Sequence, residues 1–182
     1  MANIIRTVTK FEAASRQLDT AIHLFFSGGD PISIHTLAAS AGNVFADLSE
    51  RKLGHSWRLY LGDSNQLSKN ELKKTIHREW NFFKHADFDP DATLEFDEST
   101  TDHVIFVASL DCAELQQKLA HPTQAYQIWY IALYPDKFPN SEPLFAIAQN
   151  ALPGLPHLER SEQIRVGGEF LAEKVRLYAT NM

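Results

Sequence analysis

The sequence predicts an all-α domain, a compact helical bundle of about six or seven helices, and three observations indicate this fold. Apolar side chains recur at intervals of three and four residues, which places them on one face of a helix. Capping residues precede several of these stretches, and glycine or proline follows them. The chain of 182 residues is long enough for one core and short for two. We therefore expect a single helical domain.

The first two helices are expected to form an antiparallel hairpin over residues 9–26 and 31–51. Thr9 begins a capping box, in which side chains satisfy backbone N–H groups of the first turn. Two glycines end the first helix, since glycine adopts the left-handed C-terminal position at little cost. Asp30 followed by Pro31 is typical of the start of a helix. The tight joint between the two stretches favours an antiparallel pair.

The rest of the chain predicts further helices with short connections. Residues 55–65 are compatible with a short extended piece or with a loop anchored by aromatic side chains. Ser68 begins a second capping box, and an acidic loop that contains proline follows the helix it starts. Helices are expected over residues 68–86, 101–119, 122–134, 142–151 and 159–179.

The single helical domain is expected to span residues 1–182. The core bundle covers about residues 9–134, and C-terminal helices over about residues 142–180 pack on it. Gly167 and Gly168 are expected to weaken the last helix, because glycine costs about 1 kcal/mol relative to alanine inside a helix.

Composition excludes several functional classes. The net charge of −6 is unlike that of a protein that coats nucleic acids through a broad basic face. Cys112 is the single cysteine, so neither an intramolecular disulfide nor a thiolate zinc cluster can form, and its apolar neighbours predict burial. No signal-peptide core, membrane-length apolar run or glycine-rich phosphate loop occurs. We expect a cytoplasmic protein that does not bind membranes, and the sequence specifies no cofactor.

The helix over residues 68–86 carries an unusual polar face. His77, Asn81 and His85 are spaced four residues apart, so they are expected to stack along one ridge with Arg78 beside them. These can be ordinary surface side chains. Alternatively they form a site for metal-free cleavage of RNA, with His85 as general acid or base, Arg78 neutralising phosphate charge and Asn81 orienting the substrate. The apolar face of the same helix is expected to hold Leu72, Ile76, Trp80 and Phe83.

Two family resemblances involve this helix. The spacing of Arg78 and His85 resembles the arginine–histidine signature of HEPN domains. That resemblance implies a small all-α bundle, a metal-independent ribonuclease or toxin-type activity, and a dimer with a composite site. Residues 30–38 and 81–87 together resemble a family of small uncharacterised bacterial all-helical proteins. This second resemblance covers about residues 10–110 and implies no activity.

A metal site is the other chemical hypothesis. His35 lies on a stripe of small residues on the second helix, which permits close approach of another helix. It is expected to be a packed core histidine, or else to meet His77 or His85 together with Asp87 around a transition-metal ion. The metal ligands in this second interpretation are His35, His77 and Asp87.

The acidic loop offers a calcium interpretation. Carboxylates alternate along residues 87–98 as in an EF-hand loop, although Ala92 stands where a glycine is needed for the sharp turn. The alternative is a solvated loop that offsets neighbouring lysines. Taken together, the sequence favours a binding or interaction protein that forms a homodimer or binds another protein, with a ribonuclease acting on RNA as the alternative and a metal-binding protein as the second.

Overall fold

The structure is a computed structural model that describes residues 5–66, 68–87, 89–116 and 119–180. Within these ranges it contains eight α-helices, two short 3-10 helices and no strand, which confirms the all-α prediction. The α-helices are α1 (Lys10–Phe26), α2 (Pro31–Leu53), α3 (Trp57–Ser64), α4 (Lys69–Lys84), α5 (Thr100–Leu115), α6 (His121–Leu133), α7 (Pro143–Ala151) and α8 (Arg160–Thr180).

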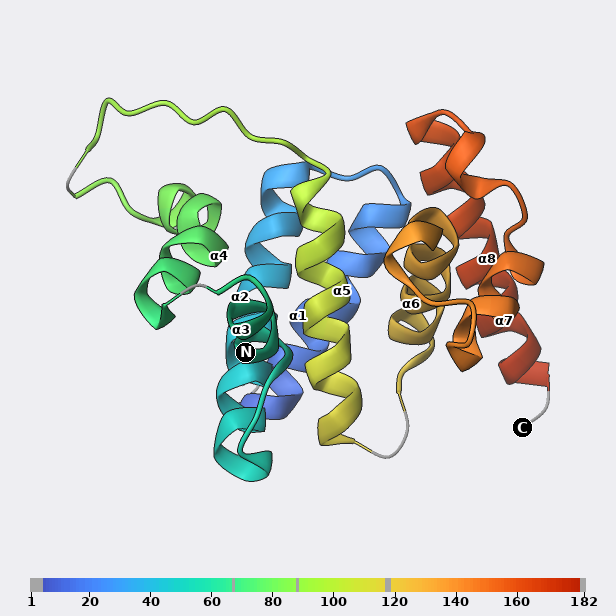
Figure 1. Ribbon diagram of the computed structural model, residues 1–182, viewed down its shortest axis with the longest axis horizontal. Helices are drawn as coiled ribbons and strands as arrows, with labels where there is room; N and C mark the ends of the chain where they lie inside the picture. The colour runs from blue at the N-terminus through green and yellow to red at the C-terminus, as the bar shows by residue number, and fades with distance from the viewer. Residues whose placement is uncertain (1–4, 67, 88, 117–118, 181–182) are drawn as a thin grey trace.

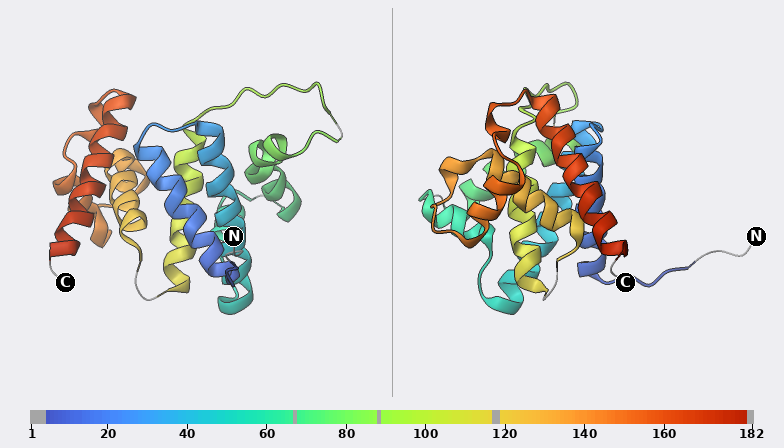
Figure 2. Two further views of the ribbon diagram at one scale, coloured as in Figure 1. Left: turned by 180° about the vertical axis from the view of Figure 1, so that it is seen from behind. Right: turned by 90° about the vertical axis from the view of Figure 1, so that its right-hand side faces the viewer.

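The helices lie side by side along the longest axis of the molecule, in an order that differs from their order in the chain (Figure 1). The α1–α2 hairpin packs against α5 in the middle, and α6 lies beside them with α7 and α8 on its outer side. Helices α3 and α4 lie at the opposite end, where they contact α2 and α5. Seen from behind, α1 crosses in front of α5, from the side of α2 to the side of α6 (Figure 2). In the described part of the chain, no helix is long and apolar enough to cross a membrane.

Local signals define the hairpin as expected. The Thr9 hydroxyl accepts the Glu12 N–H at 3.1 Å, and the Glu12 carboxylate accepts the Thr9 N–H at 2.8 Å. The Asp30 carboxylate accepts the Ser33 N–H at 2.7 Å and so caps α2. Gly28 lies in the left-handed region with a φ of +67°, which glycine adopts without strain. Each cap satisfies backbone groups that a helix end would otherwise leave unpaired.

Helix α3 is the one α-helix of the described chain that the sequence did not predict, because residues 55–65 were expected to be an extended piece or a loop. Its N-cap, Ser56, accepts the Leu59 N–H at 3.1 Å and donates its hydroxyl to Glu50 of α2 at 2.9 Å. The Trp57 N–H donates to Asp111 of α5 at 2.9 Å. Two of these partners come from other helices, so the start of α3 depends on tertiary contacts that the local sequence does not reveal.

A cluster of aromatic side chains lies in the core between α1, α6 and α8. The rings of Phe25, Phe26, Tyr126 and Trp129 meet mostly edge to face, with centroids 5.1–5.7 Å apart. Such arrangements add favourable electrostatics to the burial of large apolar surfaces. The single cysteine, Cys112, is buried as predicted.

The glycine pair of α8 belongs to this core. The helix runs without a break through Gly167 and Gly168. A Cβ added at Gly167 would overlap the ring of Phe26 and would lie 2.7 Å from Trp129 Cδ1. The expected weakness therefore has a packing reason, because only glycine lets α8 approach the aromatic rings this closely.

Candidate functional site

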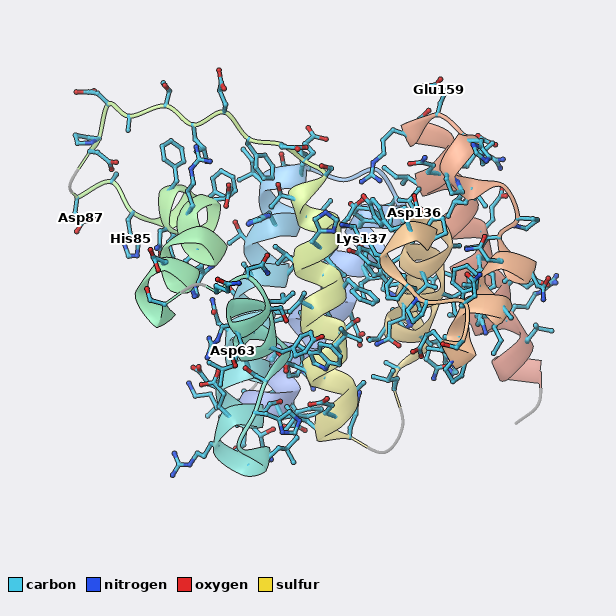
Figure 3. All side chains as sticks on the ribbon, in the orientation of Figure 1. Asp63, His85, Asp87, Asp136, Lys137 and Glu159 are labelled. Carbon is cyan, nitrogen blue, oxygen red and sulfur yellow. The ribbon has the colours of Figure 1, made fainter. Side chains whose placement is uncertain are left out.

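The three residues predicted for RNA cleavage line one open pocket. Arg78, Asn81 and His85 face the connection from α4 to α5 across a space of about 640 Å³. All three are exposed, and His85 and Asp87 lie at the outer edge of the molecule (Figure 3). Asp87 and Asp89 share the pocket, and Asp87 Oδ1 lies 3.8 Å from His85 Nδ1. The pocket thus combines two basic side chains with two carboxylates.

His77 does not belong to the expected ridge. Its side chain is buried, its Nδ1 lies 3.3 Å from Asn43 Nδ2, and its ring packs against Trp80. His85 follows the last helical residue with an extended backbone, so it also leaves the line of the helix. The predicted stack therefore separates because the His77 side of α4 faces α2. The side chains of Leu72 and Ile76, predicted for the apolar face, lie outside the described part.

The structure places His35 in the core. Its side chain is fully buried, and its Nδ1 lies 3.1 Å from the Thr101 hydroxyl oxygen. The rings of Phe83 and Phe96 meet it edge on. Burial lowers the pKa of His35, which favours the neutral ring. Nε2 of His35 has no hydrogen-bond partner among the described residues.

The predicted metal ligands are not brought together. In the part of the chain that the structure describes, no three histidine, cysteine, aspartate or glutamate side chains form a group that could hold a metal ion. His35 contacts Thr101, His77 contacts Asn43, and Asp87 is exposed in the connection after α4. The described carboxylates of residues 87–98 likewise form no such group.

A different, better enclosed pocket lies between α2 and α5. We call it the α2–α5 pocket; it has a volume of about 210 Å³ and is closed by α3 and α4. Apolar side chains form most of its wall, and charged side chains reach it from α3, α4 and α5. It is lined by Ala39, Gly42, Asn43, Ala46, Arg58, Leu61, Glu79, Thr100, His103, Val104, Val107, Ala108 and Asp111.

The stripe of small residues on α2 creates this pocket. A Cβ at Gly42 would lie 3.3 Å from Ala108 Cβ, so the predicted close approach of another helix occurs here, against α5. One turn to either side, Ala39 and Ala46 also line the pocket. The stripe was visible in the sequence, but the pocket also needs α3 and α4 to cover it.

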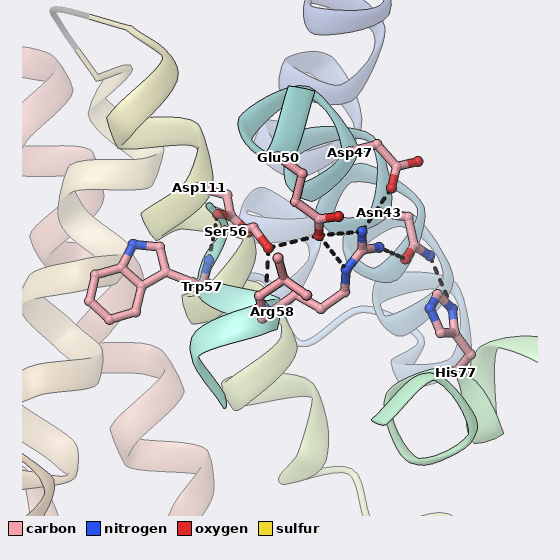
Figure 4. Close-up of polar contacts among 9 residues, drawn as sticks. Asn43, Asp47, Glu50, Ser56, Trp57, Arg58, His77 and Asp111 are labelled. Atoms are coloured by element: carbon pink, nitrogen blue, oxygen red, sulfur yellow. Dashed lines mark hydrogen bonds and ion pairs between the residues drawn. The ribbon is translucent and has the colours of Figure 1, made fainter. Parts of the chain in front are cut away.

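Arg58 is already engaged at the edge of the pocket (Figure 4). Its Nη2 lies 2.7 Å from the Glu50 carboxylate and 2.8 Å from that of Asp47. Nε also donates to Glu50 at 3.2 Å, and Nη1 to Asn43 Oδ1 at 3.5 Å. Asn43 in turn contacts His77, so this network joins α2, α3 and α4. Charge-assisted bonds of this kind hold the cation in one position.

The acidic groups of the pocket have fewer partners. Asp111 is 1% exposed, and among the described residues its Oδ1 accepts the Trp57 N–H alone (Figure 4). Burial raises the pKa of Asp111 to about 6. The side chain of Glu79 is 12% exposed, and its nearest cation, Arg78 Nη1, lies 3.8 Å away. His103 donates to or accepts from the Tyr130 hydroxyl at 2.6 Å, and burial lowers the pKa of its ring.

A second buried carboxylate has a structural role. Asp102 is fully buried and accepts two hydrogen bonds from Arg160, at 2.6 and 2.9 Å, and one from Tyr134 at 2.7 Å. The Arg160 guanidinium also lies over the rings of Phe25 and Trp129. This ion pair fixes the start of α8 to α5 and α6. Sequence reasoning missed it, because its partners are 58 residues apart.

No protein-family model, no curated protein and no solved structure matches the chain. The two family resemblances read from the sequence stay predictions.

Proposed function

We propose that this protein is a binding protein whose α2–α5 pocket holds a small ligand. The observation that carries the proposal is the pocket itself, an apolar cavity of about 210 Å³ with a few charged side chains in its wall. Binding sites for small molecules are typically concave and mostly apolar, with a small number of polar groups that orient the ligand. Residues of α2, α3, α4 and α5 contribute to its wall.

The state of Asp111 supports the same proposal. A buried carboxyl group that has no basic partner of its own costs folding free energy when it ionises. Asp111 is in this position, with its pKa raised to about 6 by burial. Strongly perturbed groups in a cleft are typical of functional sites, because a stable core seldom retains them without another role.

The test is thermal stabilisation by a library of small molecules at neutral pH. Compounds that bind the native protein raise its melting temperature. Val107→Phe adds a ring in the pocket wall and should abolish the shifts, whereas Val175→Phe on the exposed face of α8 should leave them unchanged. Shifts that persist unchanged in the Val107 variant would place binding elsewhere and contradict the proposal.

We also propose that the protein acts in the cytoplasm and binds a second copy of itself or another protein. The buried, reduced Cys112 fits a reducing compartment. Apolar side chains of α7 and α8, among them Ile147 and Leu177, are about half exposed, which is common in surfaces that bind proteins. Light scattering coupled to size-exclusion chromatography measures the mass in solution; a monomer at every concentration contradicts the homodimer.

A metal-independent ribonuclease is the second candidate function. The observation that favours it is that Arg78, Asn81 and His85 all line one open pocket. Asp87 and Asp89 in the same pocket would repel a phosphate backbone, and for this reason we rank the ribonuclease second. The test is cleavage of RNA by purified protein and by His85→Ala, with EDTA present. Equal background cleavage in the two samples would refute it.

A further inference from the structure

Arg58, the cation of the α2–α5 pocket, is already engaged by side chains of α2. All three nitrogens of the Arg58 guanidinium donate to side chains of α2. Asp47 and Glu50 together carry two negative charges against this one cation. The amide of Asn43 contacts Arg58 through its oxygen and His77 through its nitrogen. Arg58 is thus unsuited to bind an anionic ligand, since its charge is already offset.

The two carboxylates of the pocket, in contrast, have few partners. Asp111 Oδ1 accepts the Trp57 N–H, and no donor among the described residues reaches Oδ2. Among the described residues, the cation nearest to the Glu79 carboxylate is Arg78 at 3.8 Å, and the Arg78 side chain is 63% exposed. Both carboxylates line the apolar pocket. A buried carboxylate without a close cation is stabilised strongly by any cation that enters beside it.

The size of the pocket limits the ligand. A cavity of about 150 Å³ can hold a benzene molecule. The α2–α5 pocket, with about 210 Å³, has room for such a ring and a short chain, while Val104, Val107 and Leu61 provide apolar contacts. A sugar or a nucleotide would need several donors and acceptors around its whole surface, and this wall is mostly apolar.

We infer that the ligand of the α2–α5 pocket is a small organic cation, an ammonium group on an apolar body, which Asp111 and Glu79 recognise. The inference rests on the proposed function, because it names the class of ligand for the same pocket. Asp111 supplies a buried carboxylate oxygen, and Glu79 supplies a second carboxylate from α4. The apolar walls exclude water from the body of the ligand, which strengthens the charged contact.

The test compares three probes of similar shape: 2-phenylethylammonium, 2-phenylethanol and phenylacetate. Their affinities are measured by isothermal titration calorimetry at pH 7.5, where Asp111 is ionised according to its pKa of about 6. We expect the ammonium to bind about tenfold more tightly than the alcohol, as is typical of a charge-assisted hydrogen bond, and the carboxylate to bind least.

Two variants connect this preference to the pocket. Asp111→Asn and Glu79→Gln keep the shape of the side chains and remove one charge each. Each should lower the ammonium-to-alcohol ratio of affinities toward one. Glu159→Gln, at the exposed start of α8 far from the pocket (Figure 3), is the matched control and should keep the wild-type ratio. Melting curves confirm that each variant is folded.

The outcomes separate the inference from the proposed function. Equal affinities for the ammonium and the alcohol, both lost in Val107→Phe, would overturn the cation inference and leave a neutral-ligand pocket. A library that yields only neutral or anionic ligands dependent on Val107 has the same meaning. An ammonium preference that both charge-removing variants retain would also overturn the inference. If neither probes nor library compounds bind in a manner dependent on Val107, the proposed function itself fails.

Discussion

The two ends of this molecule use small residues in opposite ways. At the α8 end, Gly167 lies against the rings of Phe26 and Trp129, so the space left by a missing side chain is filled. At the α4 end, Ala39 and Ala46 lie beside a pocket that no side chain fills. A small residue on a helix therefore signals close packing only where the neighbouring element presents something large enough to occupy the gap. Where it does not, the same residue marks a cavity.

The largest effect is expected from the ion pair that holds the packed end. Arg160→Met removes the cation of a pair whose carboxylate, Asp102, is fully buried. Breaking a buried pair on one side costs about 3–5 kcal/mol of unfolding free energy, because the remaining charge is uncompensated. Denaturant titration measures the loss. The control is Arg165→Met, which breaks exposed pairs with Glu162 and Glu169 and should cost much less, because water screens charges at the surface.

A smaller loss is expected from Gly167→Ala. Alanine favours a helix over glycine by about 1 kcal/mol, so propensity alone predicts stabilisation. Overpacking against Phe26 and Trp129 costs about 1–3 kcal/mol or more, and we expect it to prevail. The free energy of unfolding should therefore fall by about 2 kcal/mol in all. A more stable variant would show that the α8 interface is loose, and the comparison between the two ends would no longer hold.

At the α4 end, Asp111→Asn should raise stability at neutral pH. The pKa of Asp111 is raised in the folded protein to about 6 from an ordinary value of 3.8, so the folded state holds its proton longer than the unfolded chain does. Wild-type stability should then decrease between about pH 4 and pH 6 and stay level above, a total of roughly 1–3 kcal/mol from this group. The variant lacks that decrease.

The measurement is the difference in unfolding free energy between Asp111→Asn and wild type at pH 4 and at pH 7.5. The variant should gain on the wild type as the pH rises, since only the wild type carries the buried charge. A difference independent of pH would mean that Asp111 ionises as easily in the folded protein as in the unfolded chain. The variant's amide oxygen can still accept the Trp57 N–H, so the cap of α3 is kept.

The smallest effect is expected from filling the pocket. Ala39→Val adds methyl groups in the pocket wall at a position that is 7% exposed, so the unfolding free energy should stay within about 1 kcal/mol of the wild type. Ala41→Val is the matched change on the same helix, at a fully buried position that does not line the pocket. There the added methyl groups should cost about 1–3 kcal/mol. Equal losses at the two positions would argue that the pocket closes in solution.

The sequence predicted features that depend on neighbours along the chain. The caps at Thr9 and Asp30 are local, so the hairpin and its boundaries followed from a few residues. Helix α3 did not, because its first turn depends on Glu50 and Asp111 of other helices. The helix expected over residues 101–119 is α5, and it ends at Leu115. Helix propensity alone gives no reason for that earlier end.

The candidate site was harder to predict than the fold. The face of α4 that meets α2 decides whether His77 is buried, and periodicity placed it with Asn81 and His85 instead. The acidic members of the pocket, Glu79 and Asp111, stand in helices whose packing no local pattern specifies. The small stripe on α2 was the one available signal. It indicated where another helix would approach, but not that α3 and α4 would roof the space beside it.

The hydrogen bond from the Trp57 N–H to Asp111 couples the pocket to the fluorescence of a tryptophan. One carboxylate belongs both to the pocket wall and to the first turn of α3, so a guest that pulls on Asp111 also shifts the backbone that carries the Trp57 indole. The other two tryptophans are held elsewhere, Trp129 in the core and Trp80 by Ser40. Occupancy should therefore change the fluorescence of Trp57, and Trp57→Phe should remove that part of the signal while binding continues.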